Sequence, residues 1–337
     1  MRKQIFITPL VLSALTFAAV YVWGGLEALL LTGILSVLEV TLSFDNAVIN
    51  AKVLGRMTEV WQKRFLTWGI FLAVFGTRLI LPALIISAVV WLSPLSVLWL
   101  VLYNPAHYAE LLTRVQPVIS AFGGSFLLMV ALKYFFDETK GVHWIHVVER
   151  HLVRWGRIEA VEIAFGLLCI LALSFAVPAS QGVILVAGII GIVLFIFVEG
   201  ITNSLGIGSA GIVSTGLALF LYLNILDSTF SLDGVIGAFA LTTRLPIIVA
   251  GLGIGAYFVH TMTLYQAQRR TLDSLIYLEH GAHWAIFGLA CSMFIGLIIH
   301  VPEIVRGSIG LCFVLLAYVS SRKELANGLS TSASGNL

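Results

Sequence analysis

Two short polar stretches interrupt long apolar runs of this chain and carry the side chains best suited to chemistry. The first acidic motif, "EVTLSFDNAVINA", spans Glu39–Ala51, and the second acidic motif, "DSTFSLDGVIGAF", spans Asp227–Phe239. Aligned without a gap, both read acid, Thr, Ser, acid at the same spacing. The matched pairs are Glu39 with Asp227, Thr41 with Thr229, Ser43 with Ser231, and Asp45 with Asp233.

These two motifs offer oxygen ligands only. The aligned positions supply four carboxylates and four hydroxyls, the amide of Asn46 adds another oxygen, and the motifs contain no Cys or His. Such a set favours hard cations such as Mn²⁺, Mg²⁺ or Ca²⁺ over Zn²⁺ or Cu⁺. Four acids exceed what one Na⁺ needs, and they could also carry counter-transported protons. The alternative is a set of protonated acids that hydrogen-bond to neighbouring helices.

Helix geometry limits how the first motif could bind one ion. In a straight helix Glu39, Ser43, Asn46 and Asn50 share a face, while Asp45 points roughly 120° away from Glu39. We therefore expect the helix to break between residues 41 and 44, which would free backbone carbonyls as further ligands. The alternative is that Asp45 serves a neighbouring helix. In the second motif Gly234 stands where Asn46 does and makes a break easier.

The surrounding segments are those of a membrane protein. Of the 337 residues, 59% are hydrophobic and only 11% are charged, and the mean hydropathy is +1.03. Apolar segments long enough to cross a bilayer, which takes roughly 20 residues, predict about ten spans. They begin near Ile5, Leu26, Phe65, Pro117, Glu159, Gln181, Ser209, Leu245, Gly281 and Ile304. A shorter apolar stretch, Leu95–Leu102, could be re-entrant.

The basic residues predict how these spans are oriented. Basic loops are retained in the cytoplasm, and with ten spans fifteen of the 19 Lys and Arg residues fall on one side. Both termini are then cytoplasmic, and the first segment is an anchor in the cell (inner) membrane. Because these charges are dispersed, they indicate no nucleic-acid partner. The three cysteines have no paired spacing, so they predict neither disulfides nor a thiolate site.

An inverted repeat organises the predicted domains. The motifs fall in the second and seventh spans, so the two copies cross the membrane in opposite directions. Ionised acids at the bilayer centre cost roughly 2.5 to 3.5 kcal/mol each, and two antiparallel copies could share one ion there. The predicted parts are an anchor helix (1–25), the first repeat (26–136), a basic cytoplasmic loop with two linking helices (137–208), the second repeat (209–300), a C-terminal helix (301–326) and a disordered tail (327–337).

Each of the other polar side chains at membrane depth has two possible roles. Arg78 pairs with a motif acid or extends toward an interface. Its repeat partner His260 is a proton relay or a packing residue. Glu199 is a ligand on the access path or a hydrated helix end. In the basic loop, residues 133–157, we favour an amphipathic interfacial helix over a metal sensor. A possible accessory metal site, which lacks the H-E-x-x-H order, comprises Glu279, His280 and His283.

Taken together with "FVEGITNS" (197–204) and "YLEHGAHWAI" (277–286), the acidic motifs resemble the TerC family of membrane proteins, in a branch catalogued as a domain of unknown function. The family is associated with tellurium resistance and belongs with the LysE-type exporters, which are built from inverted three-helix repeats. The resemblance implies Mn²⁺ efflux. The implied ion-binding positions are Glu39, Asp45, Asn46, Asp227 and Asp233.

The sequence thus predicts an all-α secondary transporter and not an enzyme. A hard divalent metal ion is the expected substrate, protons are the expected counter-ions, the lipid bilayer is the expected partner, and no prosthetic group is needed. One alternative is a LysE-like exporter of another small solute or a tellurium-resistance-associated membrane protein. A remote one is an intramembrane aspartyl hydrolase, although Ser231-Leu232 before Asp233 does not fit the G-x-G-D pattern of such enzymes.

Overall fold

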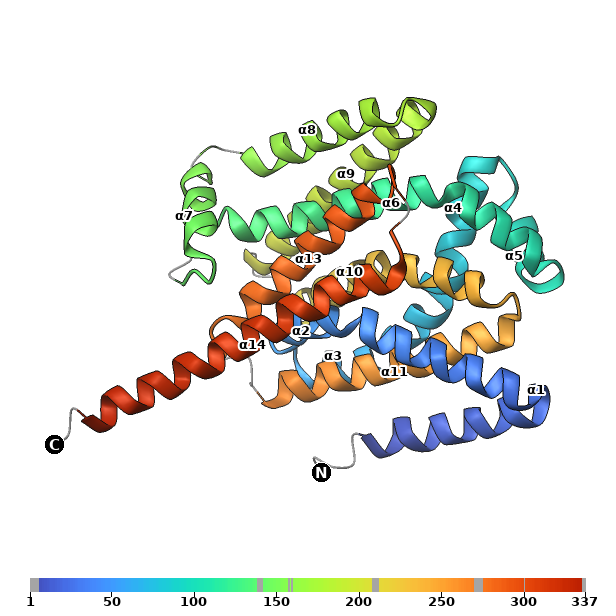
Figure 1. The fold of residues 1–337 in the computed structure, drawn as a ribbon, viewed down its shortest axis with the longest axis horizontal. Helices are drawn as coiled ribbons and strands as arrows, with labels where there is room; N and C mark the ends of the chain where they lie inside the picture. The colour runs from blue at the N-terminus through green and yellow to red at the C-terminus, as the bar shows by residue number, and fades with distance from the viewer. Residues whose placement is uncertain are drawn as a thin grey trace.

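The computed structural model describes residues 6–137, 142–156, 158, 160–207, 212–269, 275–299 and 301–334. In this part of the chain every regular element is a helix, and no strand occurs (Figure 1). The predicted all-α class is therefore confirmed. Long helices are the expected outcome for such an apolar chain, because a helix satisfies its backbone hydrogen bonds within its own segment.

Five helices among the described residues are long and apolar enough to cross a membrane. A sixth is added if a bent pair within α10 (Ile212–Leu241) counts as one span. Membrane character is thus supported, but fewer than the ten predicted spans pass this test of length and composition among the described residues. The five are α1 (Ile7–Leu42), Leu72–Val90 across η3 (Leu72–Ile80) and α4 (Leu81–Val90), α6 (Pro105–Phe135), Pro178–Ile201 across η4 (Pro178–Ser180) and α9 (Gln181–Ile207), and α11 (Leu245–Arg269).

The other predicted segments are also helical but do not pass this test. They are α8 (Val161–Ala176), α13 (Leu278–Ile295) and α14 (Glu303–Ser334). α14 runs into the polar tail for which we expected disorder. The short apolar stretch forms α5 (Pro94–Tyr103), whose ten residues are too few to span a bilayer.

Local sequence explains several helix ends. Asn104 caps α6 by accepting a hydrogen bond from the His107 amide, and Pro105 occupies the first turn, where its missing N–H costs nothing. Gly25 divides α1, because its φ of 71° and ψ of −163° leave the helical region. The two arms of α1 meet there and fold back on each other (Figure 1). The break separates the predicted anchor from the next predicted span.

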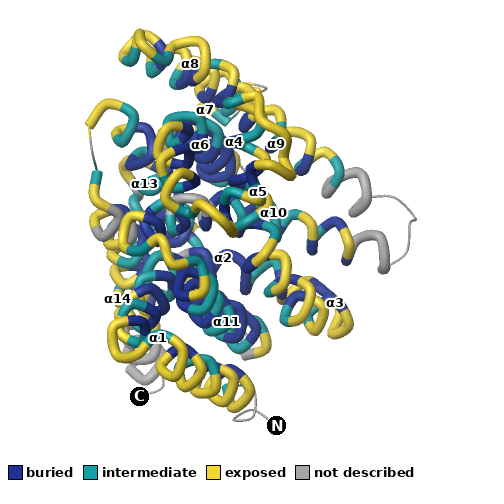
Figure 2. Tube along the Cα trace, turned by 90° about the vertical axis from the view of Figure 1, so that its right-hand side faces the viewer, coloured by how far each residue is buried: buried dark blue, intermediate teal, exposed yellow. Residues whose placement is uncertain are grey.

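Burial divides the helices into an inner and an outer set. The described part of α6 between Ile119 and Phe135 is almost wholly buried, and α2 (Phe44–Leu54) and α11 are also largely inside (Figure 2). The first arm of α1 and α8 instead expose large apolar side chains, including Val22 and Leu168. An apolar outer surface of this kind suits contact with lipid.

Candidate functional site

A buried ion pair lies at the end of α1. Glu39 and Arg78 are only 3% and 4% exposed, and the Arg78 Nη2 group contacts Glu39 Oε1 directly. Ser43 Oγ donates to the same carboxylate oxygen at 3.0 Å, and Arg78 Nη1 donates to the carbonyl of Ala73. The prediction that Arg78 pairs with a motif acid is confirmed. A buried carboxylate requires such compensation, because an isolated charge in a low-dielectric interior is very costly.

Two glycines of α11 let α1 pack closely enough against it to bury Glu39. A Cβ atom at Gly251 would lie 2.6 Å from Leu35 Cβ, and one at Gly255 would lie 2.5 Å from Glu39 Cβ. Ser36 Oγ also donates to the Gly251 carbonyl at 3.1 Å. Small residues four apart let helix backbones approach closely in a membrane. This close contact therefore places Glu39 against α11.

The predicted helix break is present in the first motif. α1 ends at Leu42, Ser43 has φ −101° and ψ 11°, and α2 begins at Phe44. In the second motif α10 is not interrupted, but it bends by 41° between Thr229 and Gly234. The two motifs thus deviate from a straight helix at matching positions, by different means.

A hydrogen bond joins the two motifs. Asn46 Nδ2 donates to Asp227 Oδ1 at 2.8 Å, and both side chains are buried. A second contact joins neighbouring elements, since the Thr77 and Ser228 hydroxyls lie 2.9 Å apart. The side chains of Asp45 and Asp233 lie outside the described residues, although their backbones belong to α2 and α10.

The hydroxyls of the motifs play unequal parts. Ser43 touches the Glu39 carboxylate, whereas Thr41 Oγ1 donates to the Val37 carbonyl and Thr229 Oγ1 to the Ile225 carbonyl of their own helices. Ser231 Oγ is buried and has no hydrogen-bond partner among the described residues. Of the four aligned hydroxyls, Ser43 and Ser231 are therefore the two that do not bond to a carbonyl of their own helix.

Arg78 belongs to one π-helical segment, and His260 packs against another. The chain from Phe65 to Ile80 contains two π-helical segments, η2 (Phe65–Gly69) and η3, and such widened turns are rare and concentrate at functional sites. The His260 ring stacks on Phe65 with centroids 4.5 Å apart, and its Nδ1 atom lies 3.0 Å from the Ala256 carbonyl. The charges of Asp227 and Arg78 both act on this imidazole. His260 is therefore a buried packing residue that also interacts with charged side chains.

The proposed accessory metal residues diverge in the structure. Glu279 pairs with Lys52, His280 Nδ1 lies 3.0 Å from Glu149 Oε2, and His283 stacks on Tyr134. Within the described ranges, no group of three or more His, Cys, Asp and Glu side chains is arranged to hold a metal. Glu199 lies 3.0 Å from Lys133 Nζ, which also lies 3.6 Å from Glu162. Glu199 is therefore part of an ion-pair cluster.

Glu149 is a buried acid that sequence reasoning did not single out. It lies on α7 (His146–Trp155), accepts a hydrogen bond from Trp284 Nε1 at 3.0 Å and two from the backbone amides of residues 144 and 145, and contacts His280. Burial opposes ionisation, but the bonds from His280 and Trp284 outweigh it and lower the pKa of Glu149 to about 2. Glu149 therefore links α7 to α13 through its contacts with His280 and Trp284.

Of the contacts that sequence reasoning missed, one left a readable signal. Gly251 and Gly255 form a G-x-x-x-G pattern, which is typical of close helix packing in membranes. Lys52 and Glu149 look like ordinary loop or interfacial charges in the sequence. Their partners are Glu279 and His280, far along the chain, so only the folded structure identifies them.

Fold and site together define a class: an all-α protein with several apolar, membrane-length helices and a buried polar centre joined between α1, α2, η3, α10 and α11. The chain belongs to the family described as "protein of unknown function (DUF475)", whose sequence profile matches residues 44–327. Searches of the curated proteins and of the solved structures give no match.

Proposed function

We propose that this chain is a secondary transporter that exports a hard divalent cation, with Mn²⁺ as the best-fitting substrate. One observation carries the proposal: the Asn46–Asp227 hydrogen bond joins two like acidic motifs inside a bundle of apolar helices. Buried acids at membrane depth mark ion pathways or proton relays more often than structural contacts. A second buried acid, Glu39, lies in the same centre.

The ligands would come from Glu39, Asp45, Asn46, Asp227 and Asp233. The described carboxylates are satisfied by protein donors, so a cation must exchange with them: Arg78 at Glu39, and the Asn46 amide at Asp227. Rotation of that amide would turn its oxygen toward Asp227, which converts the present pair into two oxygen ligands. Hard cations such as Mn²⁺ favour this donor set. Protons on the same acids would serve as counter-ions.

The proposed architecture has ten spans, both termini in the cytoplasm of the cell membrane, and an inverted repeat that rocks to give alternating access. Three features support the repeat. Glu39 and Asp227 are motif partners in one centre, Arg78 and His260 lie beside them, and both motif helices deviate near Ser43 or Ser231. The TerC resemblance and its implied manganese export are part of the same proposal.

Transport should be measured as Mn²⁺ uptake into inside-out vesicles, with and without a pH gradient. We expect uptake by the parent chain and a loss of about tenfold or more in Asp227→Asn, Asp45→Asn and Asp233→Asn, which corresponds to about 1.4 kcal/mol or more of lost binding free energy. The matched control is Glu110→Gln, because Glu110 is 77% exposed and lies outside both motifs. Its uptake should equal that of the parent.

Two results would count against the proposal. Uptake that survives all three substitutions would remove the motifs from the pathway. An inactive parent, with Mn²⁺, Mg²⁺ and Ca²⁺ each tried, would favour a LysE-like exporter of another solute, which amino-acid uptake in the same vesicles would test. Release of a peptide product by purified protein would instead favour the hydrolase.

A further inference from the structure

A cavity of about 810 Å³ lies beside α2, between α11, α13 and the end of α6. Its inner wall includes Val48 and Ile49, and its outer part includes Arg56 and Asp137. Ile49 is roughly 4.5 Å along the axis and 60° around the helix from Asn46, whereas Val48 is roughly 160° around the helix from it. The cavity therefore extends along α2 as far as Ile49, beside the face that carries Asn46.

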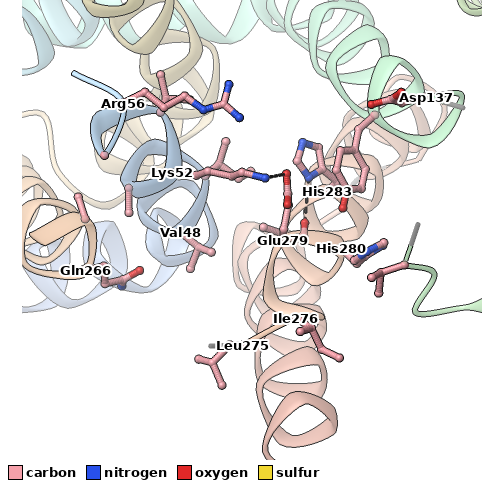
Figure 3. A pocket seen from close by; sticks show the side chains of 18 of the residues that line it. Val48, Lys52, Arg56, Asp137, Gln266, Leu275, Ile276, Glu279, His280 and His283 are labelled. Atoms are coloured by element: carbon pink, nitrogen blue, oxygen red, sulfur yellow. Dashed lines mark hydrogen bonds and ion pairs between the residues drawn. The ribbon is translucent and has the colours of Figure 1, made fainter. Parts of the chain in front are cut away.

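One face of α2 follows this cavity along its length. Val48, Lys52 and Arg56 are spaced four residues apart, so they lie above one another on the helix. Lys52 thus stands between the inner wall and the outer part. Its ammonium group reaches across to the carboxylate of Glu279 at the start of α13 (Figure 3). The ion pair therefore crosses the cavity between its outer part and its inner wall.

This ion pair is suited to opening. Lys52 and Glu279 are 39% and 36% exposed, and ion pairs with such solvent access are individually weak. The His283 Nδ1 atom lies 2.9 Å from the Glu279 carbonyl, which keeps the first turn of α13 in place when the side chain moves. The side chains can then separate without unfolding either helix. By contrast, the Glu39–Arg78 pair is almost fully buried.

We propose that this cavity is the access vestibule of the cation site and that the Lys52–Glu279 ion pair is its gate. When the ion pair is formed, the Lys52 side chain blocks the cavity between its outer part, at Arg56, and its inner wall, at Val48. With the pair broken, the Glu279 carboxylate is available to an arriving cation, which takes the place of the lysine ammonium. The nature of the permeant cation rests on the proposed function, whereas the gate itself rests on the geometry of the cavity.

The test measures how fast a thiol behind the gate reacts. Val48→Cys is introduced into full-length protein in which Cys169, Cys291 and Cys312 are replaced by serine, and a small cationic methanethiosulfonate is added in detergent. Val48 lines the cavity and is only 3% exposed. We expect the labelling rate to rise by about two- to fivefold, the range set by a weak ion pair, in both Lys52→Met and Glu279→Gln. Ile49→Cys provides a second reporter position.

The two single variants separate a gate from a simple charge effect. Loss of Lys52 should attract the cationic reagent and loss of Glu279 should repel it, so a pure field effect changes the two rates in opposite directions. A gate raises both rates, and the exchanged pair Lys52→Glu with Glu279→Lys returns the rate to the parent value. Lys63→Met, an exposed cation of α3 (Glu59–Arg64) outside the cavity, is the control and should leave the rate unchanged.

Unchanged rates in both single variants, opposite changes, or failure of the exchanged pair to restore slow labelling would each overturn the gate. The labelling needs no transport. If the gate behaves as expected but vesicles accumulate no Mn²⁺, the gate stands and the proposed substrate fails. If Mn²⁺ uptake depends on Asp227 but labelling ignores Lys52, the function stands and the gate fails.

Discussion

In the first acidic motif Glu39 pairs with the guanidinium of Arg78, whereas in the second Asp227 accepts a hydrogen bond from Asn46 and lies near His260. The two acids occupy matching positions of the two motifs, but their partners differ. Arginine keeps its charge at any physiological pH, while an amide is neutral and an imidazole can change its charge. The comparison indicates that the described partner of Glu39 carries a permanent charge, whereas the described hydrogen-bond donor to Asp227 is neutral.

The largest effect should come from removing the charged partner. Arg78→Met leaves the Glu39 carboxylate buried without its counter-charge, which should destabilise the protein by about 3–5 kcal/mol. His260→Phe keeps the stack on Phe65 and loses one hydrogen bond, a cost of about 0.5–1.5 kcal/mol. Unfolding of purified protein in detergent measures both.

A rescue variant sharpens this difference. Adding Glu39→Gln to Arg78→Met removes the stranded charge and should recover most of the lost stability. If Arg78→Met is as stable as the parent, Glu39 does not depend on Arg78, and the contrast between a charged and a neutral partner fails.

The next effect concerns the bond between the motifs. Asn46→Ala and Asp227→Ala should show a coupling energy of about 1.5–3 kcal/mol in a double-mutant cycle, as expected for a hydrogen bond to a charged group. The same unfolding measurement supplies the four stabilities. Asn46→Ala combined with Glu110→Ala should be additive within about 0.5 kcal/mol. Additivity between positions 46 and 227 would show that the two motifs are not energetically joined.

The cost of adding a methyl group should also differ between Gly255, which packs against Glu39 of the first motif, and Gly234 of the second motif. Gly255→Ala places a methyl group 2.5 Å from Glu39 Cβ on a neighbouring helix and should cost about 1–3 kcal/mol. Gly234→Ala brings its methyl group no closer than 3.4 Å, to Glu39 Oε2, which is ordinary contact. Its stability should change by less than about 1 kcal/mol. Equal effects, read from melting in detergent, would show that the α1–α11 contact is no tighter than that at the second motif.

The smallest stability effect should come from the exposed ion pair. Lys52→Met should change the free energy of unfolding by less than about 1 kcal/mol, because Lys52 and Glu279 remain accessible to solvent. Arg78→Met serves as the buried counterpart in the same assay. A loss as large as that of Arg78→Met would mean that Lys52 is structural and would not suit a gate.

Sequence reasoning was most successful where the physics is local. The expected interruption between Thr41 and Phe44 is found at Ser43, and it was expected because in one straight helix Asp45 would point roughly 120° away from Glu39. It was less successful at the accessory site. Glu279, His280 and His283 have helical spacing, yet each contacts a different element, since spacing fixes a face of one helix but not what packs against it.

By itself, the sequence determined that this protein is built of apolar helices and that its acids interrupt them at two matching places. Both follow from local rules: the length and hydropathy of a segment decide whether it suits a bilayer, and periodicity decides which residues share a face. Only the tertiary structure decided that Glu39 meets Arg78, that Asn46 meets Asp227, and that Lys52 meets Glu279. These partners are brought together by helix packing, which no local pattern encodes.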